Sequence, residues 1–145
     1  MSLINQIKLS FPSLPENVEI ARHTAAQFAA RAAGFDMTVP ELEDIKTAIS
    51  EAVSNAIIHG YAEGRGTVEL VMNRYDSKLE FLIIDKGCGI ADIEEARQPS
   101  FSSHPERMGI GFAFMESFMD ELYVDSAVGE GTTVRMVKNL IPPSH

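Results

Sequence analysis

The sequence predicts a two-layer α/β sandwich, with an antiparallel or mixed sheet and helices on one face. Strand-like segments, the first with apolar residues at alternate positions, lie at residues 4–11, 67–75, 79–85, 122–127 and 132–138. Segments with helical periodicity lie at residues 16–34, 38–59 and 109–119. The last four strands come in adjacent pairs, which favours hairpins over crossover helices and therefore predicts this class.

Length and composition predict a single domain. A chain of 145 residues, 45% of them hydrophobic, can bury one compact core and is short for two. We expect the domain at residues 4–139, with loose ends at 1–3 and 140–145. No apolar run approaches the roughly 20 residues of a membrane-spanning helix, and the N-terminus lacks the order of a secretory signal. We therefore expect a cytoplasmic protein that does not enter a membrane.

Charge and cysteine content exclude further classes. The formal net charge of -9 opposes binding of nucleic acid or an anionic membrane through bulk electrostatics. An anionic ligand would need local help from a cation, a helix N-terminus or backbone N–H groups. The only cysteine, Cys88, cannot form an internal disulfide, and no second cysteine or histidine cluster offers a structural zinc site.

The first two helices carry terminal signals. The helix that begins at Glu16 has Gly34 in place for its C-terminal cap. The second helix opens with a capping box made by Thr38 and Glu41 and is expected to run to about His59. Its predicted buried stripe consists of Leu42, Ile45, Ile49, Ala52, Val53 and Ala56.

The region between the two hairpins has a less regular pattern. We expect a short helical piece at residues 92–97, then an irregular stretch at 98–108 that suits a lid, and then the helix at 109–119. The final hairpin turns at residues 128–131, where two glycines lie close together.

Glu51 and Asn55 lie one turn apart on the second helix, on the side away from the predicted stripe. Taken alone, they are ordinary polar residues of a solvated helix face. Their neighbours Ala48 and Ile58 are short or apolar, whereas a solvated face carries long charged side chains. This face is therefore better suited to being covered than to contacting water.

Glycines gather at two further places. Gly87 and Gly89 follow Asp85 at the end of an apolar strand, a pattern also found in ordinary turns. Gly109 and Gly111 open a predicted helix, where glycine allows phosphates to approach the backbone. Neither motif is specific alone, and neither matches the longer Walker or dinucleotide fingerprints.

The order of these motifs is more specific than any one of them. It resembles the N box, the two glycine boxes and the terminal threonine motif of the Bergerat-fold ATPases, which include gyrase, histidine kinases, heat-shock chaperones and mismatch-repair ATPases. Within that superfamily the chain resembles the anti-sigma factor serine kinases, most closely the sporulation type. The resembling stretches are residues 45–61, 93–99, 115–121 and 131–134.

The resemblance implies a site for Mg²⁺ and ATP. Asn55 would coordinate Mg²⁺ that bridges the phosphates, and Glu51 would orient or deprotonate the incoming hydroxyl. Asp85 would accept a hydrogen bond from the adenine amine, with support from Thr132. The glycines that would pack against base, ribose or phosphates are Gly87, Gly89, Gly109 and Gly111.

The resemblance also implies partners. These are a sporulation sigma factor, an anti-anti-sigma factor phosphorylated on serine, and a second copy of the chain in a homodimer. Arg22 occupies the family's arginine position on the sigma-facing surface, although Val18 replaces the acidic residue expected four positions before it. The segment at residues 105–109, which contains Arg107, is about two residues shorter than the family pattern.

Other functions stay open at this stage. A general-stress anti-sigma serine kinase is one alternative, and a histidine-kinase catalytic domain is another, although no helical phosphoacceptor region precedes the domain in this sequence. A nucleotide-gated binding module without phosphotransfer is a third, which the acidic Glu51 disfavours. His59, one turn after Asn55, is either a helix-end residue or a phosphate contact.

Overall fold

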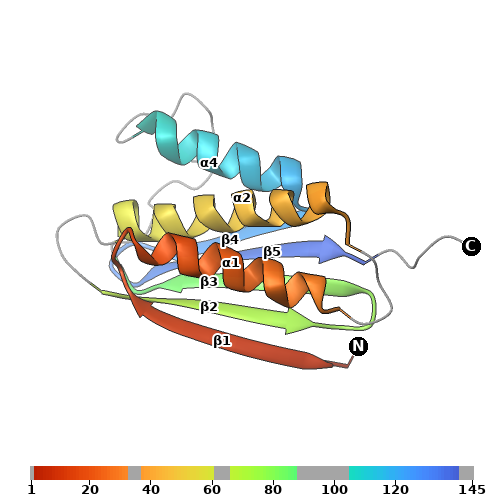
Figure 1. Cartoon of the computed structure of the whole chain (residues 1–145). Coiled ribbons are helices and arrows are strands. Elements are labelled where there is room, and N and C mark those ends of the chain that lie inside the picture. The colour runs from red at the N-terminus through yellow and green to blue at the C-terminus, as the bar shows by residue number, and fades with distance from the viewer. Residues whose placement is uncertain (1, 33–36, 61–65, 88–104, 141–145) are drawn as a thin grey trace, which may run out of the picture.

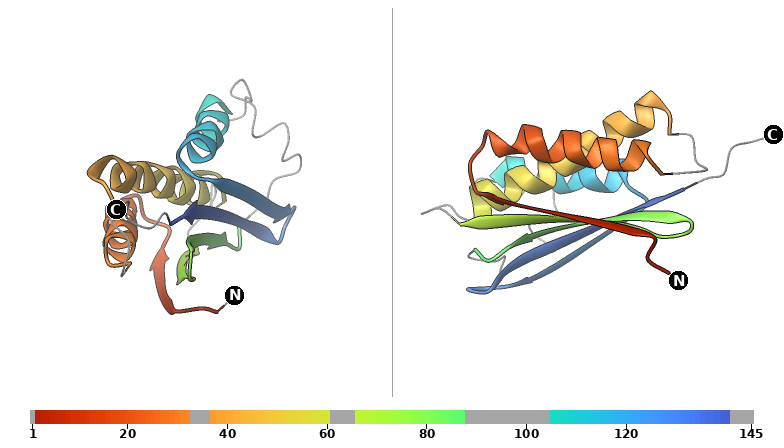
Figure 2. Two further views of the ribbon diagram at one scale, coloured as in Figure 1. Left: turned by 90° about the vertical axis from the view of Figure 1, so that its right-hand side faces the viewer. Right: turned by 60° about the horizontal axis from the view of Figure 1, so that its bottom comes forward.

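The structure, a computed structural model, describes residues 2–32, 37–60, 66–87 and 105–140, apart from the side chains at 59–60 and 105–110. Its sheet has the strand order β1-β2-β3-β5-β4, and every neighbouring pair is antiparallel. The helices cover one face of this sheet, with α2 between α1 and α4 (Figures 1 and 2). The predicted α/β sandwich is confirmed, with an antiparallel sheet.

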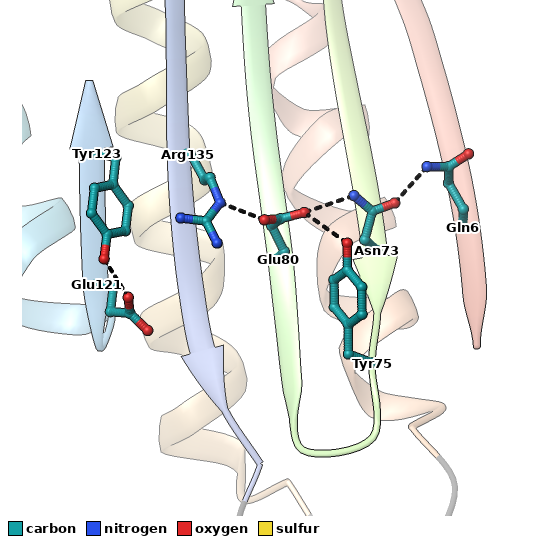
Figure 3. A network of polar contacts seen from close by, with 7 residues as sticks. All are labelled: Gln6, Asn73, Tyr75, Glu80, Glu121, Tyr123 and Arg135. Carbon is teal, nitrogen blue, oxygen red and sulfur yellow. Dashed lines mark hydrogen bonds and ion pairs between the residues drawn. The ribbon is translucent and has the colours of Figure 1, made fainter. Parts of the chain in front are cut away.

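The five strands form at the predicted segments. Their bounds are β1(Asn5–Pro12), β2(Thr67–Arg74), β3(Lys78–Asp85), β4(Glu121–Ala127) and β5(Gly131–Asn139). Because side chains alternate across a strand, Leu79, Phe81 and Ile83 of β3 face the helices and are at most 1% exposed. Glu80 points to the other face of the sheet (Figure 3).

Helix α2(Val39–Asn55) begins as predicted. The backbone N–H of Glu41 donates to Thr38 Oγ1 at 3.2 Å, and the Glu41 carboxylate accepts from the Thr38 backbone N–H at 3.2 Å. This reciprocal capping gives hydrogen-bond partners to two backbone N–H groups that have none within the helix. Of the predicted stripe, Leu42 is half-buried and the other residues are buried against the sheet. After Asn55 the chain continues in the wider turns of the π-helix η1(Ala56–Gly60).

Two predicted boundaries are wrong. Helix α1(Asn17–Ala30) ends before Gly34, because Ala32 N–H donates to the Ala29 carbonyl at 3.2 Å and tightens the last turn; Gly34 itself lies outside the described residues. Helix α4(Pro105–Phe118) begins four residues before Gly109. Proline suits a first helical turn, where its missing N–H costs nothing.

Consequently the lid predicted at residues 98–108 is helical from Pro105 onward, and Gly109 and Gly111 lie inside α4 instead of opening it. The rest of the lid and the short helix predicted at 92–97 lie outside the described residues. None of the helices in the described part of the chain combines the length and apolar character needed to cross a bilayer.

A polar network crosses the sheet face that the helices leave uncovered (Figure 3). Gln6 Nε2 donates to Asn73 Oδ1 at 2.7 Å, and Asn73 Nδ2 donates to Glu80 Oε1 at 2.9 Å. On the other side, Arg135 Nε donates to Glu80 Oε2, and the guanidinium lies 4.9 Å from the centre of the Tyr123 ring. These residues come from β1, β2, β3, β5 and β4 in turn, so the network ties every strand to its neighbour.

Candidate functional site

Glu51 and Asn55 lie against helix α4, close to Gly111. A Cβ atom placed on Gly111 would lie 3.0 Å from Asn55 Nδ2 and 3.1 Å from Glu51 Oε2. These separations are shorter than ordinary van der Waals contact, so only a glycine lets α4 pack this closely without displacing the two side chains. Three residues from two motifs far apart in the sequence therefore lie together.

Asn55 is buried and its amide has no partner. The residue is 7% exposed, and neither Oδ1 nor Nδ2 has a hydrogen-bond partner in the described part of the chain. Asn55 lies away from the α2 stripe, as expected, and its face is covered by α4. Buried polar atoms without partners cost free energy and are uncommon in folded proteins. An amide held in this way is prepared for a ligand.

Asp85 ends strand β3 and is 5% exposed. The backbone N–H of Gly87 donates to Asp85 Oδ1 at 2.9 Å, closing a tight turn. Burial raises the pKa of the carboxyl, and the backbone N–H groups of Gly87 and Thr132 oppose this effect without cancelling it. The carboxylate is therefore fixed in direction but poorly solvated, so a hydrogen-bond donor from a ligand would stabilise it.

Thr132 lies beside Asp85, because the two residues are register partners on β5 and β3. Thr132 is 9% exposed, and its Oγ1 lies 2.8 Å from Ser126 Oγ on β4. The Ser126 hydroxyl also donates to the Gly131 carbonyl at 3.0 Å. Asp85 and Thr132, which the resemblance assigns to the same end of a nucleotide, thus lie side by side with the Ser126 hydroxyl next to them.

Sequence reasoning missed two residues here, Ser126 and Gly131. Gly131 has φ +111, and a Cβ on it would come within 2.1 Å of the Asp85 carbonyl oxygen. Glycine is required at this position by both its conformation and its close approach to the Asp85 backbone. Its place at the head of the threonine motif is a signal that could have identified it. Ser126 has no such signal, because only the β4–β5 register brings it to Thr132.

Other predicted site residues are not brought into this cluster. Gly89 lies outside the described residues, as does Cys88, and for Gly109 the structure gives only its place in α4. The side chains of His59 and Arg107 are likewise outside the description. Arg22 lies on α1, on the other side of α2 from α4, and forms an ion pair with Glu19 at 3.0 Å.

A metal ion would depend on few protein ligands. Within residues 2–32, 37–60, 66–87 and 105–140, no group of three or more His, Cys, Asp or Glu side chains could hold one. Asn55 Oδ1 is a neutral oxygen without a partner, which suits Mg²⁺ that takes its remaining ligands from phosphates and water. The residues present therefore fit Mg²⁺ bound together with a nucleotide, and not a metal held by protein alone.

The sequence is similar to one protein family and to curated proteins that share one description. The sequence matches the family described as "Histidine kinase-like ATPase domain" over residues 11–138. It is 47% identical over 139 residues to the "Anti-sigma F factor" of Bacillus subtilis, covering 94% of this chain and 93% of that protein. It is 46% identical over 140 residues to the "Anti-sigma F factor" of Thermoanaerobacter pseudethanolicus, covering 95% of this chain and 96% of that protein.

Solved structures share the fold. A crystal structure of the RsbU and RsbW domains of a Mycobacterium tuberculosis protein matches with a TM-score of 0.67 at 20% identity, over 97% of this chain and 33% of that one. The histidine kinase domain of a blue-light-activated kinase from Erythrobacter litoralis matches with a TM-score of 0.56 at 20% identity, over 90% of this chain and 62% of that one. The chain therefore belongs to the family of histidine kinase-like ATPase domains and, within it, to the anti-sigma F factors.

Proposed function

We propose that this chain is an ATP-dependent protein serine kinase that also sequesters a sporulation sigma factor. Its phosphorylation substrate would be a serine of the anti-anti-sigma factor that competes for release of the sigma factor. The proposal is supported by relatives named "Anti-sigma F factor" that are 47% identical over nearly the whole chain. The observation that carries the kinase part is the unpartnered Asn55 amide, buried beside Glu51 under a glycine of α4.

The two ends of ATP would bind to different groups. Asn55 Oδ1 would coordinate Mg²⁺ on the phosphates, and Gly109 and Gly111, which carry no side chain, would let phosphates approach the backbone of α4. Asp85, buried and in need of a donor, would accept the adenine amine, supported by Thr132. Gly87 and Gly89 would let the base and ribose pack against the chain. When bound, Mg²⁺ would neutralise charge on the transferring phosphoryl group.

Glu51 would act on the serine. Its Oε2 lies against the same glycine as the Asn55 amide, so the carboxylate and the metal ligand share one small volume. A carboxylate at that position can accept a hydrogen bond or a proton from an attacking hydroxyl. The phosphoryl group would move from the ATP γ-position to the serine oxygen, with ADP as the leaving group.

Protein partners would bind elsewhere. Arg22 on α1 is about one-third exposed and would contribute to the sigma-facing surface. The acidic net charge of -9 suits partners with basic surfaces. We further expect a homodimer in the cytoplasm, where sigma factors act on RNA polymerase.

The proposal can be tested on the purified protein. Native mass spectrometry should find a bound adenine nucleotide and a second copy of the chain. Incubation with Mg-ATP and a purified anti-anti-sigma protein should then produce phosphoserine on that protein. Nucleotide binding without phosphotransfer would support a nucleotide-gated module instead, and transfer only to an anti-anti-sigma factor of the general-stress type would support that alternative.

A further inference from the structure

Gly131 lies where strand β5 begins, against the end of strand β3. Its φ is +111, and a Cβ placed on it would lie 2.1 Å from the Asp85 carbonyl oxygen and 2.8 Å from Lys86 Cα. Cβ atoms do not come this close to other atoms, and both neighbours belong to the backbone, which cannot rotate away as a side chain can. Only a residue without a side chain therefore lets β5 begin so close to the Asp85–Lys86 peptide.

The Asp85 carboxylate is held from both sides of this contact. The backbone N–H of Gly87, two residues after Asp85, donates to Oδ1 at 2.9 Å. The backbone N–H of Thr132, the residue after Gly131, also donates to the carboxyl group. A side chain on Gly131 would push the Asp85–Lys86 peptide away from the start of β5. Both backbone donors would then shift relative to the carboxylate, which would lose its fixed direction.

Gly129, in the turn between β4 and β5, offers a contrast. Its φ is +81, so Gly129 and Gly131 both have a backbone conformation that favours glycine. In the part of the chain that the structure describes, a Cβ on Gly129 would have no heavy atom within 4 Å. Conformation alone therefore accounts for glycine at position 129, whereas the contact with the Asp85 backbone is particular to position 131.

We propose that Gly131 is a positioning residue for nucleotide recognition: its missing side chain lets β5 hold the Asp85 carboxylate where it accepts the exocyclic amine of a 6-amino purine. This inference rests on the proposed ATP site and adds a residue that acts through Asp85 without touching the nucleotide. A side chain at position 131 would weaken recognition of the adenine base and leave the phosphate end, at Asn55, as it is.

Calorimetric titrations in Mg²⁺ would measure the affinities for ATP and for inosine triphosphate, which carries an oxygen in place of the 6-amino group. The proteins compared are the wild type, Gly131→Ala and Gly129→Ala. Both variants place a side chain at a positive φ, so backbone strain in this region is common to them. Loss of a hydrogen bond to a charged group lowers affinity by about 10-fold or more. We expect Gly131→Ala to reduce the preference for ATP over inosine triphosphate by about 10-fold, and Gly129→Ala to keep the wild-type preference.

A double variant tests whether Gly131 acts through Asp85. In a protein that already carries Asp85→Asn, the added Gly131→Ala change should lower ATP affinity by less than about 3-fold, because residues that act through one contact are not additive. Effects that add in full would show that Gly131 acts independently of Asp85 and would overturn the inference.

The remaining outcomes separate this inference from the proposed function. Equal losses of affinity for ATP and inosine triphosphate in Gly131→Ala, or the same loss of preference in Gly129→Ala, would overturn the inference and leave the proposed function standing. Denaturant unfolding checks that the variants fold. A Gly131→Ala protein that does not fold, where Gly129→Ala does, would also overturn the inference, because Gly131 would then serve the fold as a whole. A wild-type protein that binds neither nucleotide would overturn the proposed function and this inference with it.

Discussion

Two buried asparagines of this chain have opposite surroundings. Asn55 on α2 is 7% exposed, and its amide has no partner within the described residues. Asn73 on β2 is 6% exposed, and its amide accepts from Gln6 and donates to Glu80. The same side chain at the same burial is thus satisfied on the open face of the sheet and unsatisfied under the helices.

Two buried carboxylates of strand β3 repeat the contrast. Burial raises the pKa of Asp85, and its two backbone hydrogen bonds do not compensate. Burial would also raise the pKa of Glu80, but the hydrogen bonds from Arg135 and Asn73, together with the positive charges of Arg135 and Lys78, outweigh it and the pKa is lowered. Glu80 therefore stabilises the folded protein as an anion, whereas Asp85 costs stability in that form.

The difference separates two uses of buried polarity. The network around Glu80 completes its own hydrogen bonds, which ties neighbouring strands together (Figure 3). Asn55 and Asp85 are left incomplete on the helix-covered face, where a ligand could complete them. Free energy that is withheld from folding in this way becomes available for binding.

The largest effect is expected from Glu51→Gln, which should separate phosphotransfer from Mg-ATP binding. The amide keeps the size of the side chain beside Gly111 but cannot take a proton. Transfer to the anti-anti-sigma serine should fall by at least about 100-fold, the lower range of general-base assistance. Mg-ATP affinity should be kept or slightly improved, because one negative charge beside the phosphates is removed.

Single-turnover phosphorylation measures the transfer rate of the Glu51→Gln variant, and calorimetric titration measures its affinity for Mg-ATP. Unimpaired transfer would refute the base assignment. Loss of ATP binding would instead make Glu51 part of the metal or structural framework.

Asp85→Asn should lower the affinity for ATP and stabilise the nucleotide-free protein against unfolding. A hydrogen bond to a charged group contributes enough that ATP affinity should fall by at least about 10-fold. The folded pKa is raised above the reference value of 3.8, so stability contributed by this carboxyl is present below that value and is lost as pH rises through the folded pKa. The variant should therefore have a higher melting temperature than the wild type at pH 7, and this difference should disappear in acid.

Thermal melts of the nucleotide-free protein across pH 3 to 8 would measure this gap between wild type and Asp85→Asn. A variant that melts below the wild type at pH 7 would contradict the view of Asp85 as a destabilising anion.

Glu80→Gln should show the opposite pH dependence of stability to Asp85→Asn. Its effect should be smaller and confined to stability. Removing the charge that Arg135 and Asn73 contact should cost about 1–3 kcal/mol at pH 7. The lowered pKa means that this stability is present above the reference value of 4.5 and is lost as pH falls through the folded pKa, so the deficit should shrink in acid. ATP affinity should not change.

Denaturant unfolding compares Glu80→Gln with Glu130→Gln, a control in the exposed β4–β5 turn. A deficit no larger than that of the control would show that the network contributes nothing.

Local signals in the sequence predicted local structure well. Thr38 and Glu41 predicted the start of α2 because both residues of the capping box lie within one turn. The start of α4 at Pro105 differs from the predicted one because proline is common in irregular stretches and also suits a first helical turn. The end of α1 was misplaced because Gly34 is a strong cap signal, while the actual end depends on backbone bonds of Ala32.

The candidate site was predictable as far as its motifs reach. Glu51, Asn55 and Asp85 could be singled out because their types and spacing resemble a family. The unpartnered state of the Asn55 amide could not, because it depends on how closely Gly111 approaches from a different helix. Ser126 could not either, since only the register of β4 against β5 places it beside Thr132.

The decisive measurement pairs the two buried asparagines. Asn55→Ala and Asn73→Ala would each be titrated with Mg-ATP by calorimetry and unfolded by denaturant without nucleotide. Asn55→Ala should lose Mg-dependent ATP binding at little or no cost in stability, because its amide has no partner to lose. Asn73→Ala should keep Mg-ATP binding and lose about 1–3 kcal/mol, because two hydrogen bonds disappear. Retained Mg-ATP affinity in Asn55→Ala, or a loss of stability equal to that of Asn73→Ala, would contradict the assignment of Asn55 as the ligand of a nucleotide-bound metal.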